Sequence, residues 1–277
     1  MDTNDLMDAI IQLALDEDGT DITTEAIFPE TCNIRAVLKS KAQGIISGVQ
    51  AVKRIFALTD PGIICMFEVQ DGQTVSPGRK LAVITGPARG ILKAERTALN
   101  FFQRMSGIAT RTAEYIKHLE GTKVRILDTR KTAPGQRVFD KMAVLHGGGE
   151  NHRMGLFDMA LIKDNHIDAA GSIAEAVGRV KTAFPSVDIE VEARTLDDVK
   201  TLLELKVTRI MCDNFSLKDL KQAVALVKGR IELEASGGIT LETVREVALT
   251  GVDYISVGDI THSVKALDIS MIIEGEL

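Results

Sequence analysis

The stretch VDIEVEARTLDDVKTLLELKVTRIMCDN, residues 187–214, decides the fold. It holds a β-branched run at Val187–Val191, a helical pattern opened by Thr195 with Asp198, and a second run at Val207–Met211. A hydroxyl side chain followed three residues later by an acidic one is typical of a capped helix start. Strand, helix and strand in this order favour a right-handed crossover between two parallel strands.

The same unit recurs on both sides of this stretch. Further helices are predicted to start at Ser172 with Glu175, at Ser216 with Asp219, and near Thr240. The six predicted strands are Lys123–Leu127, Met159–Ile162, Val187–Val191, Val207–Met211, Ile231–Leu233 and Tyr254–Val257. Parallel strands that alternate with helices form either a βα barrel or an open doubly wound sheet.

The residues that follow the strands distinguish these two architectures. Charged or glycine-rich residues come after every strand, at 128–131, 163–166, 192, 213–214, 236–238 and 258. In an open sheet, ligand residues gather at one switch point and come from two or three strands. All six strands contribute here, as they do at the mouth of a barrel. We therefore predict a βα barrel over residues 109–267, with its active site at the C-terminal ends of the strands.

Residues 1–108 are predicted to form a separate, small α+β sandwich domain. Its expected elements are a helix over 4–16, strands at Ile34–Lys39, Ile63–Val69 and Lys80–Thr85, and a helix at Ala51–Leu58. The turn at 71–78 is similar to the hairpin of lipoyl and biotinyl carriers, but it has no lysine at its tip, which favours a structural role. The C-terminal tail, residues 268–277, is expected to pack back on this domain.

The composition excludes several classes of protein. The 277 residues are 45% apolar, and no apolar run reaches the roughly 18 to 20 residues of a membrane span. Met1–Asp16 carries aspartates where a signal peptide has basic residues. Cys32, Cys65 and Cys212 form no CxxC pair and no Cys/His cluster, which argues against disulfides and structural zinc. We predict a cytoplasmic protein with no membrane association.

The charge distribution indicates a small anionic ligand. The formal net charge of the chain is −6, yet residues 96–163 contain twelve basic and six acidic side chains. A nucleic-acid surface is the competing interpretation, but it needs a longer basic stripe with interleaved aromatic residues. Aromatic residues make up only 4% of this chain. The sequence therefore favours a small polyanion over nucleic acid.

Two glycine-containing strand ends are predicted to bind phosphate. Ser236, Gly237 and Gly238 precede the helix expected near Thr240, so their amides and the helix start can hold a phosphate. Val257, Gly258 and Asp259 follow the next strand, which makes the pair typical of the phosphate site on the last two strands of a barrel.

A set of basic residues is expected at the same mouth of the barrel. Its members are Arg96, Arg130, Lys131, Arg153 and Lys163, with His152 beside Arg153. Arginine binds planar carboxylates through two hydrogen bonds, and lysine acts as a point charge on phosphate. Several cations that converge on one site repel one another unless an anion compensates them.

Two acidic residues at the mouth have three possible roles. Glu192 and Asp213 follow neighbouring strands and can bind a divalent ion that bridges phosphates, hydrogen-bond ribose hydroxyls, or neutralise the lysines. His146 lies in a loop with glycines 147–149, and its position favours hydrogen bonding over catalysis.

Five motifs then carry a resemblance to a known family. They are Glu95–Asn100, Asp128–Gly135, Gly147–Arg153, Leu161–His166 and Ser256–Ser263. In this order, over essentially the whole chain, the sequence resembles the quinolinate phosphoribosyltransferases, which are type II phosphoribosyltransferases. The resemblance implies an N-terminal sandwich with hammerhead-like topology, an incomplete βα barrel, and a dimer with a shared active site. It also implies that quinolinate and phosphoribosyl pyrophosphate, with Mg²⁺, give nicotinate mononucleotide, pyrophosphate and CO₂ on the route to NAD.

The resemblance also assigns roles to residues. Thr129, Arg130, Lys131, His152 and Arg153 would hold the pyridine dicarboxylate, and Arg96 would come from the partner subunit. The catalytic residues would be Lys163, Glu192 and Asp213, which also meet the phosphoribosyl group, with Glu192 and Asp213 at Mg²⁺. Residues 236–238 and 257–259 would hold the 5-phosphate.

Some positions depart from the family pattern, and two rival functions remain. Ala133 stands where threonine is frequent, Met142 where an aromatic residue is common, and Asp259 places an acid beside a phosphate loop, where we expect only its backbone to contribute. A related enzyme that acts on another heterocycle would share this fold. A non-catalytic sensor of phosphorylated metabolites would keep the mouth but turn nothing over.

Overall fold

The computed structural model describes residues 3–276, so Met1, Asp2 and Leu277 of the predicted domains lie outside the described residues. The chain forms two compact units. The first contains residues up to 113, residues 132–148 and residues from 261 onward, and the second contains 114–131 and 149–260. The predicted boundary at 108/109 falls inside the long helix α4 (Ala88–His118), and this division follows five residues later.

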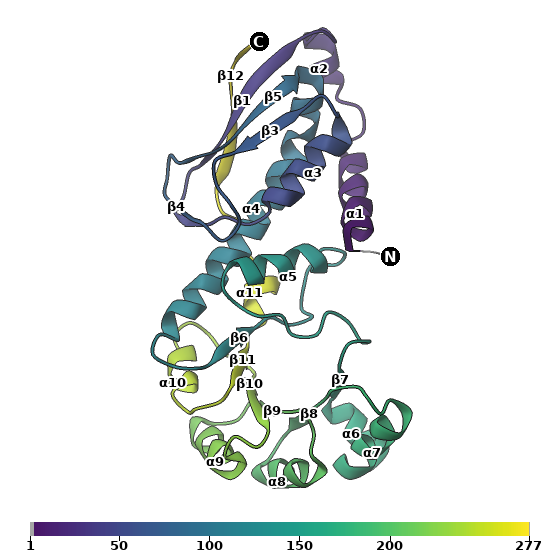
Figure 1. The fold of residues 1–277 in the computed structure, drawn as a ribbon, viewed down its shortest axis with the longest axis vertical. Helices are drawn as coiled ribbons and strands as arrows, with labels where there is room; N and C mark the ends of the chain where they lie inside the picture. The colour runs from purple at the N-terminus through teal and green to yellow at the C-terminus, as the bar shows by residue number, and fades with distance from the viewer. Residues whose placement is uncertain (1–2, 277) are drawn as a thin grey trace. The chain divides into compact units, whose positions relative to one another are not determined.

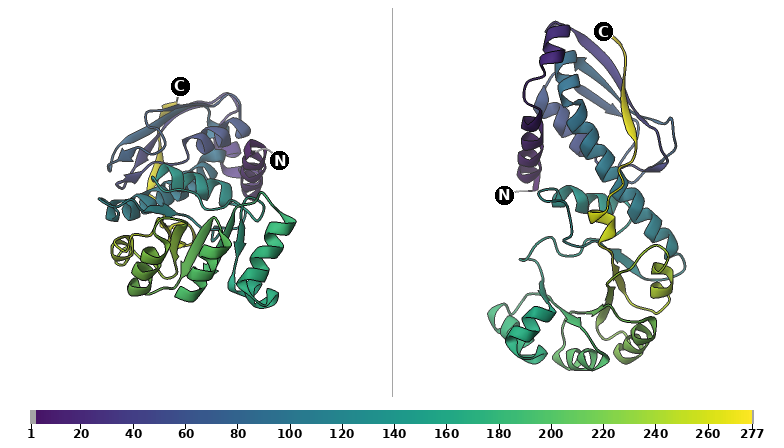
Figure 2. Two further views of the ribbon diagram at one scale, coloured as in Figure 1. Left: turned by 60° about the horizontal axis from the view of Figure 1, so that its bottom comes forward. Right: turned by 180° about the vertical axis from the view of Figure 1, so that it is seen from behind.

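The first unit is built on an antiparallel four-stranded sheet. Its strand order is β12 (Ile269–Glu276), β1 (Asn33–Ser40), β5 (Lys80–Pro87) and β3 (Ile64–Phe67). A two-stranded ladder joins β2 (Gly44–Ile45) to β4 (Thr74–Val75). The tail strand β12 pairs with β1 over its length, as the yellow strand beside the purple one in Figures 1 and 2 shows.

The helices of the first unit include the two predicted ones and others that were not predicted, the long α4 among them. α1 (Thr3–Asp18) contains the predicted helix, and α3 (Val49–Thr59) buries an apolar face that includes Ile55 and Phe56. α2 (Ile22–Ile27) is new, and Asp21 caps it by accepting a hydrogen bond from the Thr24 amide. α5 (Arg137–His146) also belongs to this unit.

The second unit confirms the predicted incomplete βα barrel. Its six strands are all parallel, in the order β6 (Arg125–Leu127), β11 (Tyr254–Ser256), β10 (Glu232–Ser236), β9 (Arg209–Asp213), β8 (Ile189–Ala193) and β7 (Ala160–Ile162). β6 and β7 are the two edges of this sheet. The curved sheet therefore stays open between β6 and β7, its first two strands in the sequence.

Helices cover the outer side of this curved sheet, as Figure 1 shows. They are α6 (Asp164–Ala170), α7 (Ile173–Ala183), α8 (Leu196–Leu205), α9 (Leu217–Val227) and α10 (Val244–Ala248), and the short α11 (Asp259–His262) follows β11. The predicted caps are confirmed at three of them, because Ser172, Thr195 and Ser216 each accept a hydrogen bond from the amide three residues on.

The predicted helix start near Thr240 is wrong. α10 begins at Val244 with Thr243 at its N-cap, and it is only five residues long. The Thr240 amide donates to the Thr243 hydroxyl at 3.0 Å, and the Thr243 amide donates to the Thr240 carbonyl at 3.2 Å. This turn uses the local hydrogen bonds of residues 240–243 before a helix can begin.

Gly107 and Gly178 form a matched pair for a stability test, because both lie in helices with opposite surroundings. A Cβ at Gly107 in α4 would lie 2.2 Å from the Lys265 carbonyl oxygen, whereas a Cβ at Gly178 in α7 would meet nothing within 4 Å. We expect Gly107→Ala to destabilise the protein by about 1–3 kcal/mol, since backbone must move. We expect Gly178→Ala to stabilise it by about 0.5–1 kcal/mol through helix propensity.

Urea unfolding of both variants and the wild type measures this difference. Equal midpoints for Gly107→Ala and the wild type would show that α4 and the segment at Lys265 do not pack as described.

Candidate active site

A short segment after β6 brings His152 to the sheet. The Glu150 amide donates to the Ile126 carbonyl at 2.8 Å, and the Asp128 amide donates to the Glu150 carbonyl at 3.2 Å. This segment therefore lies parallel to the end of β6 and extends its ladder by an isolated bridge between Leu127 and Glu150.

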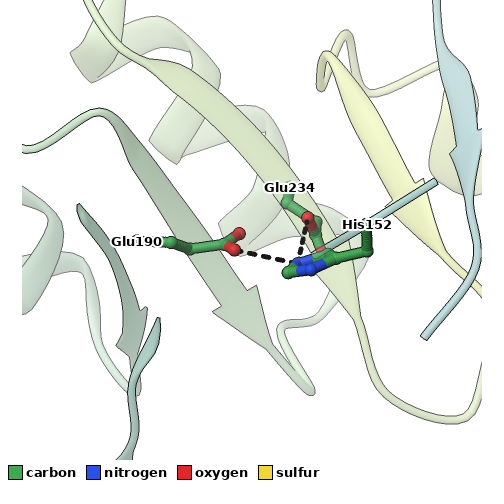
Figure 3. Close-up of side chains that lie close together, drawn as sticks. All are labelled: His152, Glu190 and Glu234. Carbon is green, nitrogen blue, oxygen red and sulfur yellow. Dashed lines mark ion pairs between the residues drawn. The ribbon is translucent and has the colours of Figure 1, made fainter. Parts of the chain in front are cut away.

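His152 is buried between two carboxylates, as Figure 3 shows. Its Nε2 lies 2.9 Å from Oε2 of Glu190 on β8 and 3.5 Å from Oε2 of Glu234 on β10. Both glutamates are completely buried, and the histidine is only 8% exposed. Its other ring nitrogen, Nδ1, accepts a hydrogen bond of 2.8 Å from the Arg153 amide. The main-chain amide of His152 donates to the buried Asp128 carboxylate at 2.9 Å.

The protonation of this cluster is shared among its members. Burial alone would lower the pKa of the His152 imidazole, but the hydrogen bonds and charges of Glu190 and Glu234 outweigh it and raise that pKa to about 9. Burial raises the pKa of Glu190 to about 7. The raised pKa of the ring favours a second ring proton, yet Nδ1 accepts the Arg153 N–H. We place the extra proton on the carboxylate side, because an acceptor nitrogen carries no hydrogen.

Arg209 supplies the positive charge beside the two carboxylates. Its guanidinium lies 3.4 Å from Glu234 and 3.2 Å from Glu232, and the charges of Glu190 and Glu234 raise its pKa against the opposing effect of burial. The same guanidinium stacks on the Tyr254 ring, 4.0 Å from its centroid, and Arg125 stacks on that ring at 4.1 Å. An ionic and aromatic cluster therefore occupies the N-terminal edge of the sheet, below His152.

Lys163 and Glu192 meet at the ends of β7 and β8. Lys163 Nζ lies 3.4 Å from Glu192 Oε1, and the Asp164 amide donates to Glu192 Oε2 at 3.1 Å. The Lys163 side chain is about half exposed, at 48%. Three roles were left open for Glu192, and the structure shows one of them, the neutralisation of a lysine.

Asp213 lies directly beside the predicted phosphate loop. It pairs in register with Ser236, and the Asn214 side chain donates to Asp213 Oδ2 at 2.8 Å. A Cβ at Gly237 would lie 2.1 Å from Asn214 Oδ1, and Gly237 has φ +100°, so only glycine fits there. Gly238 also has a positive φ and is exposed. The two glycines thus keep the main chain of this loop open to a ligand.

The second predicted phosphate segment follows β11, the neighbour of β10 in the sheet. Val257 is buried, Gly258 is partly exposed, and Asp259 is the first residue of the four-residue helix α11. The two segments thus leave adjacent strands at the same edge of the sheet, as the sequence predicted.

Three further bases of the predicted set belong to this unit. Arg130 and Lys131 are exposed after β6, and the Lys131 amide donates to the Thr129 hydroxyl at 3.0 Å. Arg153 is partly buried, and its guanidinium donates to the Met159 carbonyl at 3.0 Å. Burial and the charge of Arg130 both lower the pKa of Arg153, which indicates that these two cations lie near each other.

Arg96 and His146 belong to the first unit. Arg96 is exposed on α4, so it comes from outside the barrel unit. His146 Nδ1 lies 2.8 Å from the Ser47 hydroxyl and 4.0 Å from Asp71, contacts that fit the expected hydrogen-bonding role.

Sequence reasoning missed the buried cluster below the mouth, which contains Glu190, Glu234, Arg209 and Asp128. A signal for it was present, because β8 and β10 carry charged residues at alternate positions, 190 and 192 in one and 232 and 234 in the other. Alternate positions of a strand share a face, so acids in this pattern on β8 and β10, the two strands that flank β9, require partners on the same face.

The chain matches known proteins over nearly its full length. It matches "Quinolinate phosphoribosyl transferase, N-terminal domain" over residues 21–106 and the corresponding C-terminal domain over residues 108–272. Two of the similar relatives are the chloroplastic "Nicotinate-nucleotide pyrophosphorylase [carboxylating]" of Arabidopsis thaliana, at 47% identity over 97% of this chain and 83% of that protein, and the "Probable nicotinate-nucleotide pyrophosphorylase [carboxylating]" of Bacillus subtilis, at 43% over 93% and 89%.

Solved structures agree with the sequence comparison. The nicotinate-nucleotide pyrophosphorylase of Francisella tularensis superimposes with a TM-score of 0.94 at 38% identity, covering 98% of this chain and 97% of that one. NadC from Streptococcus pyogenes gives a TM-score of 0.93 at 37% identity, covering 98% and 96%. With two family domains matched end to end and these identities, the chain belongs to the quinolinate phosphoribosyltransferase family.

Proposed function

We propose that this protein transfers the phosphoribosyl group of phosphoribosyl pyrophosphate to quinolinate and decarboxylates the product. The products are nicotinate mononucleotide, pyrophosphate and CO₂, in de novo biosynthesis of NAD, and the enzyme is a pentosyltransferase. The observation that carries this proposal is the parallel sheet whose C-terminal edge holds Lys163, Glu192 and Asp213 beside an open glycine loop.

The dicarboxylic acid binds to the basic residues that follow β6. Arg130, Lys131 and Arg153 offer three cations, and two of them lie close enough to lower the pKa of one. An anion with two carboxylates relieves this repulsion and accepts hydrogen bonds from both guanidinium groups. Thr129 contributes from the same loop. His152 belongs to this group in the sequence, and its part is taken up below.

The sugar phosphate binds across β7 to β11. Residues 236–238 and 257–259 hold the 5-phosphate through main-chain amides, with Asp259 contributing its backbone alone. Lys163 meets the phosphoribosyl group. Glu192 and Asp213 offer carboxylate oxygens on neighbouring strands, the donors that Mg²⁺ prefers, so these two residues would hold the metal. Mg²⁺ bound there with phosphoribosyl pyrophosphate would neutralise charge on the leaving pyrophosphate.

Positioning and electrostatics account for the reaction, with no covalent nucleophile. The anomeric carbon gains positive character as pyrophosphate leaves, and the carboxylates of Glu192 and Asp213 stabilise that charge. The bases after β6 hold the pyridine nitrogen in line with this carbon. Decarboxylation follows transfer: the C–C bond breaks to release CO₂, its electron pair stays on the ring carbon beside the cationic nitrogen, which stabilises it, and a proton from water then replaces the carboxylate.

The surroundings of the enzyme are also proposed. Within residues 3–276, no helix combines the length and apolarity needed to cross a membrane. Some plant relatives are named chloroplastic or mitochondrial. For this chain we propose the cytoplasm, a homodimer that shares its active sites through Arg96, and no nucleic-acid partner.

An assay with two acids tests the activity. Purified protein with Mg²⁺ and phosphoribosyl pyrophosphate should convert quinolinate into nicotinate mononucleotide and release CO₂, while nicotinate in a parallel tube should give no product, because it lacks the second carboxylate. Turnover of a different heterocycle alone would replace the proposed substrate. Binding of both ligands without release of pyrophosphate would establish a sensor instead of an enzyme.

Two substitutions should separate the two substrate sites. Arg153→Ala should raise the KM for quinolinate roughly 10- to 100-fold, and Lys163→Ala should do the same for phosphoribosyl pyrophosphate, since each removes charged hydrogen bonds. Steady-state kinetics with each substrate varied in turn measures both constants. Arg179→Ala, which removes an exposed helix pair with Glu175, is the matched control and should change neither. Equal effects of both variants on both substrates would contradict the assignment.

Mixed dimers test the shared site. At substrate concentrations near the wild-type KM, Arg96→Ala and Lys163→Ala proteins should each have low activity, but a mixture unfolded and refolded together should regain activity, because one site in each heterodimer combines intact Arg96 with intact Lys163. Each variant refolded alone is the control. No recovery in the mixture, with heterodimers confirmed by mass spectrometry, would place Arg96 in the site of its own subunit.

A further inference from the structure

Both ring nitrogens of His152 are engaged by the protein itself. Nε2 faces Glu190 at 2.9 Å and Glu234 at 3.5 Å, and Nδ1 accepts the Arg153 amide at 2.8 Å. The ring is almost completely buried. We propose that His152 is a positioning residue, fixed by Glu190 and Glu234, that sets the main chain at Arg153 and does not itself bind the carboxylates of the substrate. This inference rests on the proposed function for the role of Arg153.

The first step of the argument is the anchor. Nδ1 accepts a hydrogen bond, so the ring proton lies on Nε2, the nitrogen that lies within 3.5 Å of both carboxylates. The Asp128 carboxylate accepts the main-chain N–H of the same residue. His152 is therefore held at its backbone by the end of β6 and at its ring by β8 and β10. A side chain fixed at both ends has one orientation.

The second step links this anchor to Arg153. The Arg153 amide donates to the ring, and its guanidinium donates to the Met159 carbonyl at the start of β7. The main chain and the side chain of Arg153 thus have separate fixed partners. Loss of the ring frees the Arg153 amide and lets the guanidinium shift relative to Arg130, so a planar dicarboxylate loses one of its two forks.

The third step concerns charge around the cluster. Among the charged groups around His152, Glu190 on β8 and Glu234 on β10 lie beside the ring, and Asp128 after β6 accepts the main-chain N–H. Arg209 on β9 lies beside both glutamates. Ser256 on β11 and the Cys212 thiol on β9 also lie near Glu234. Arg209 and the extra proton on the carboxylate side already balance the charge of the two glutamates. The three side chains have the composition of a metal site, but a metal ion there would meet the Arg209 guanidinium.

Glutamine at position 152 distinguishes positioning from direct binding. Its amide nitrogen reaches about as far as Nε2 and donates to Glu190, but it carries no positive charge. His152→Ala removes the donor, and we expect the KM for quinolinate to rise roughly 10- to 100-fold with little change in the KM for phosphoribosyl pyrophosphate. We expect His152→Gln to recover most of this loss. A glutamine variant as impaired as the alanine variant would overturn the proposal in favour of a cationic contact with the substrate.

The carboxylate side has its own pair of variants and a matched control. Glu190→Gln keeps a side-chain oxygen beside Nε2, whereas Glu190→Leu removes it, so the leucine variant should behave like His152→Ala and the glutamine variant should recover. Glu232→Gln changes a half-exposed glutamate on β10 that has no contact with His152, and its KM for quinolinate should equal that of the wild type. Impairment by Glu232→Gln as large as by Glu190→Leu would show a general loss of structure and refute the assignment.

A measurement on the free enzyme needs no activity at all. In protein labelled with ¹⁵N-histidine, the signal lost in His152→Gln identifies the ring among the five histidines. We expect one protonated and one unprotonated ring nitrogen at neutral pH, both unchanged when quinolinate saturates the site. Two protonated nitrogens, or a shift on saturation, would overturn the proposal.

The metal content of the purified protein and the turnover of quinolinate distinguish the positioning role from a metal site and from failure of the proposed function. If purified wild-type protein holds about one equivalent of metal and the Glu190→Gln variant holds none, the positioning role would be overturned in favour of a metal site. If quinolinate is not turned over, the proposed function fails, but the protonation of the ring in the free enzyme still decides the proposal.

Discussion

Glu190 and Glu234 lie completely buried on the inner face of the parallel sheet, and their charge has to be balanced within the barrel. An isolated buried carboxylate is among the most costly groups in a protein interior. Arg209 on β9 supplies a positive charge, and His152, from the segment after β6, places its ring beside both carboxylates. The arrangement of four separate pieces of chain around this centre is therefore tied to one set of ionic contacts.

Charged residues at the N-terminal ends of the parallel strands have a structural role, and those at the C-terminal ends form the proposed active site. At the N-terminal edge, Arg125, Arg209, Glu232 and Tyr254 contact one another, with both guanidinium groups stacked on one ring. At the C-terminal edge, Arg130 and Lys131 are exposed, and Lys163 has one carboxylate neighbour at 3.4 Å. A barrel can thus keep a stable base while its mouth varies with the ligand.

The sequence predicted the features that depend on local patterns. Ser172, Thr195 and Ser216 cap their helices because capping needs only residues within one turn. The barrel was predictable because every strand is followed by charged residues or glycine. The start of α10 was not, since a turn at 240–243 competes with the first helical turn. The partners of His152 could not be predicted either. They lie 38 and 82 residues further along the chain, and only the folded sheet brings them together.

The strand order of the first unit has a consequence for how the protein is made. β12 pairs with β1 across almost the whole chain, and one of their ion pairs joins residues 239 positions apart. A ribosome delivers β1 early and β12 last, so the first sheet keeps an unpaired edge until synthesis of β12 is complete. Contacts of such high sequence separation form slowly. During that interval the exposed edge of β1 is a surface on which a second nascent chain could add its own strand, and protection by chaperones would have most effect there.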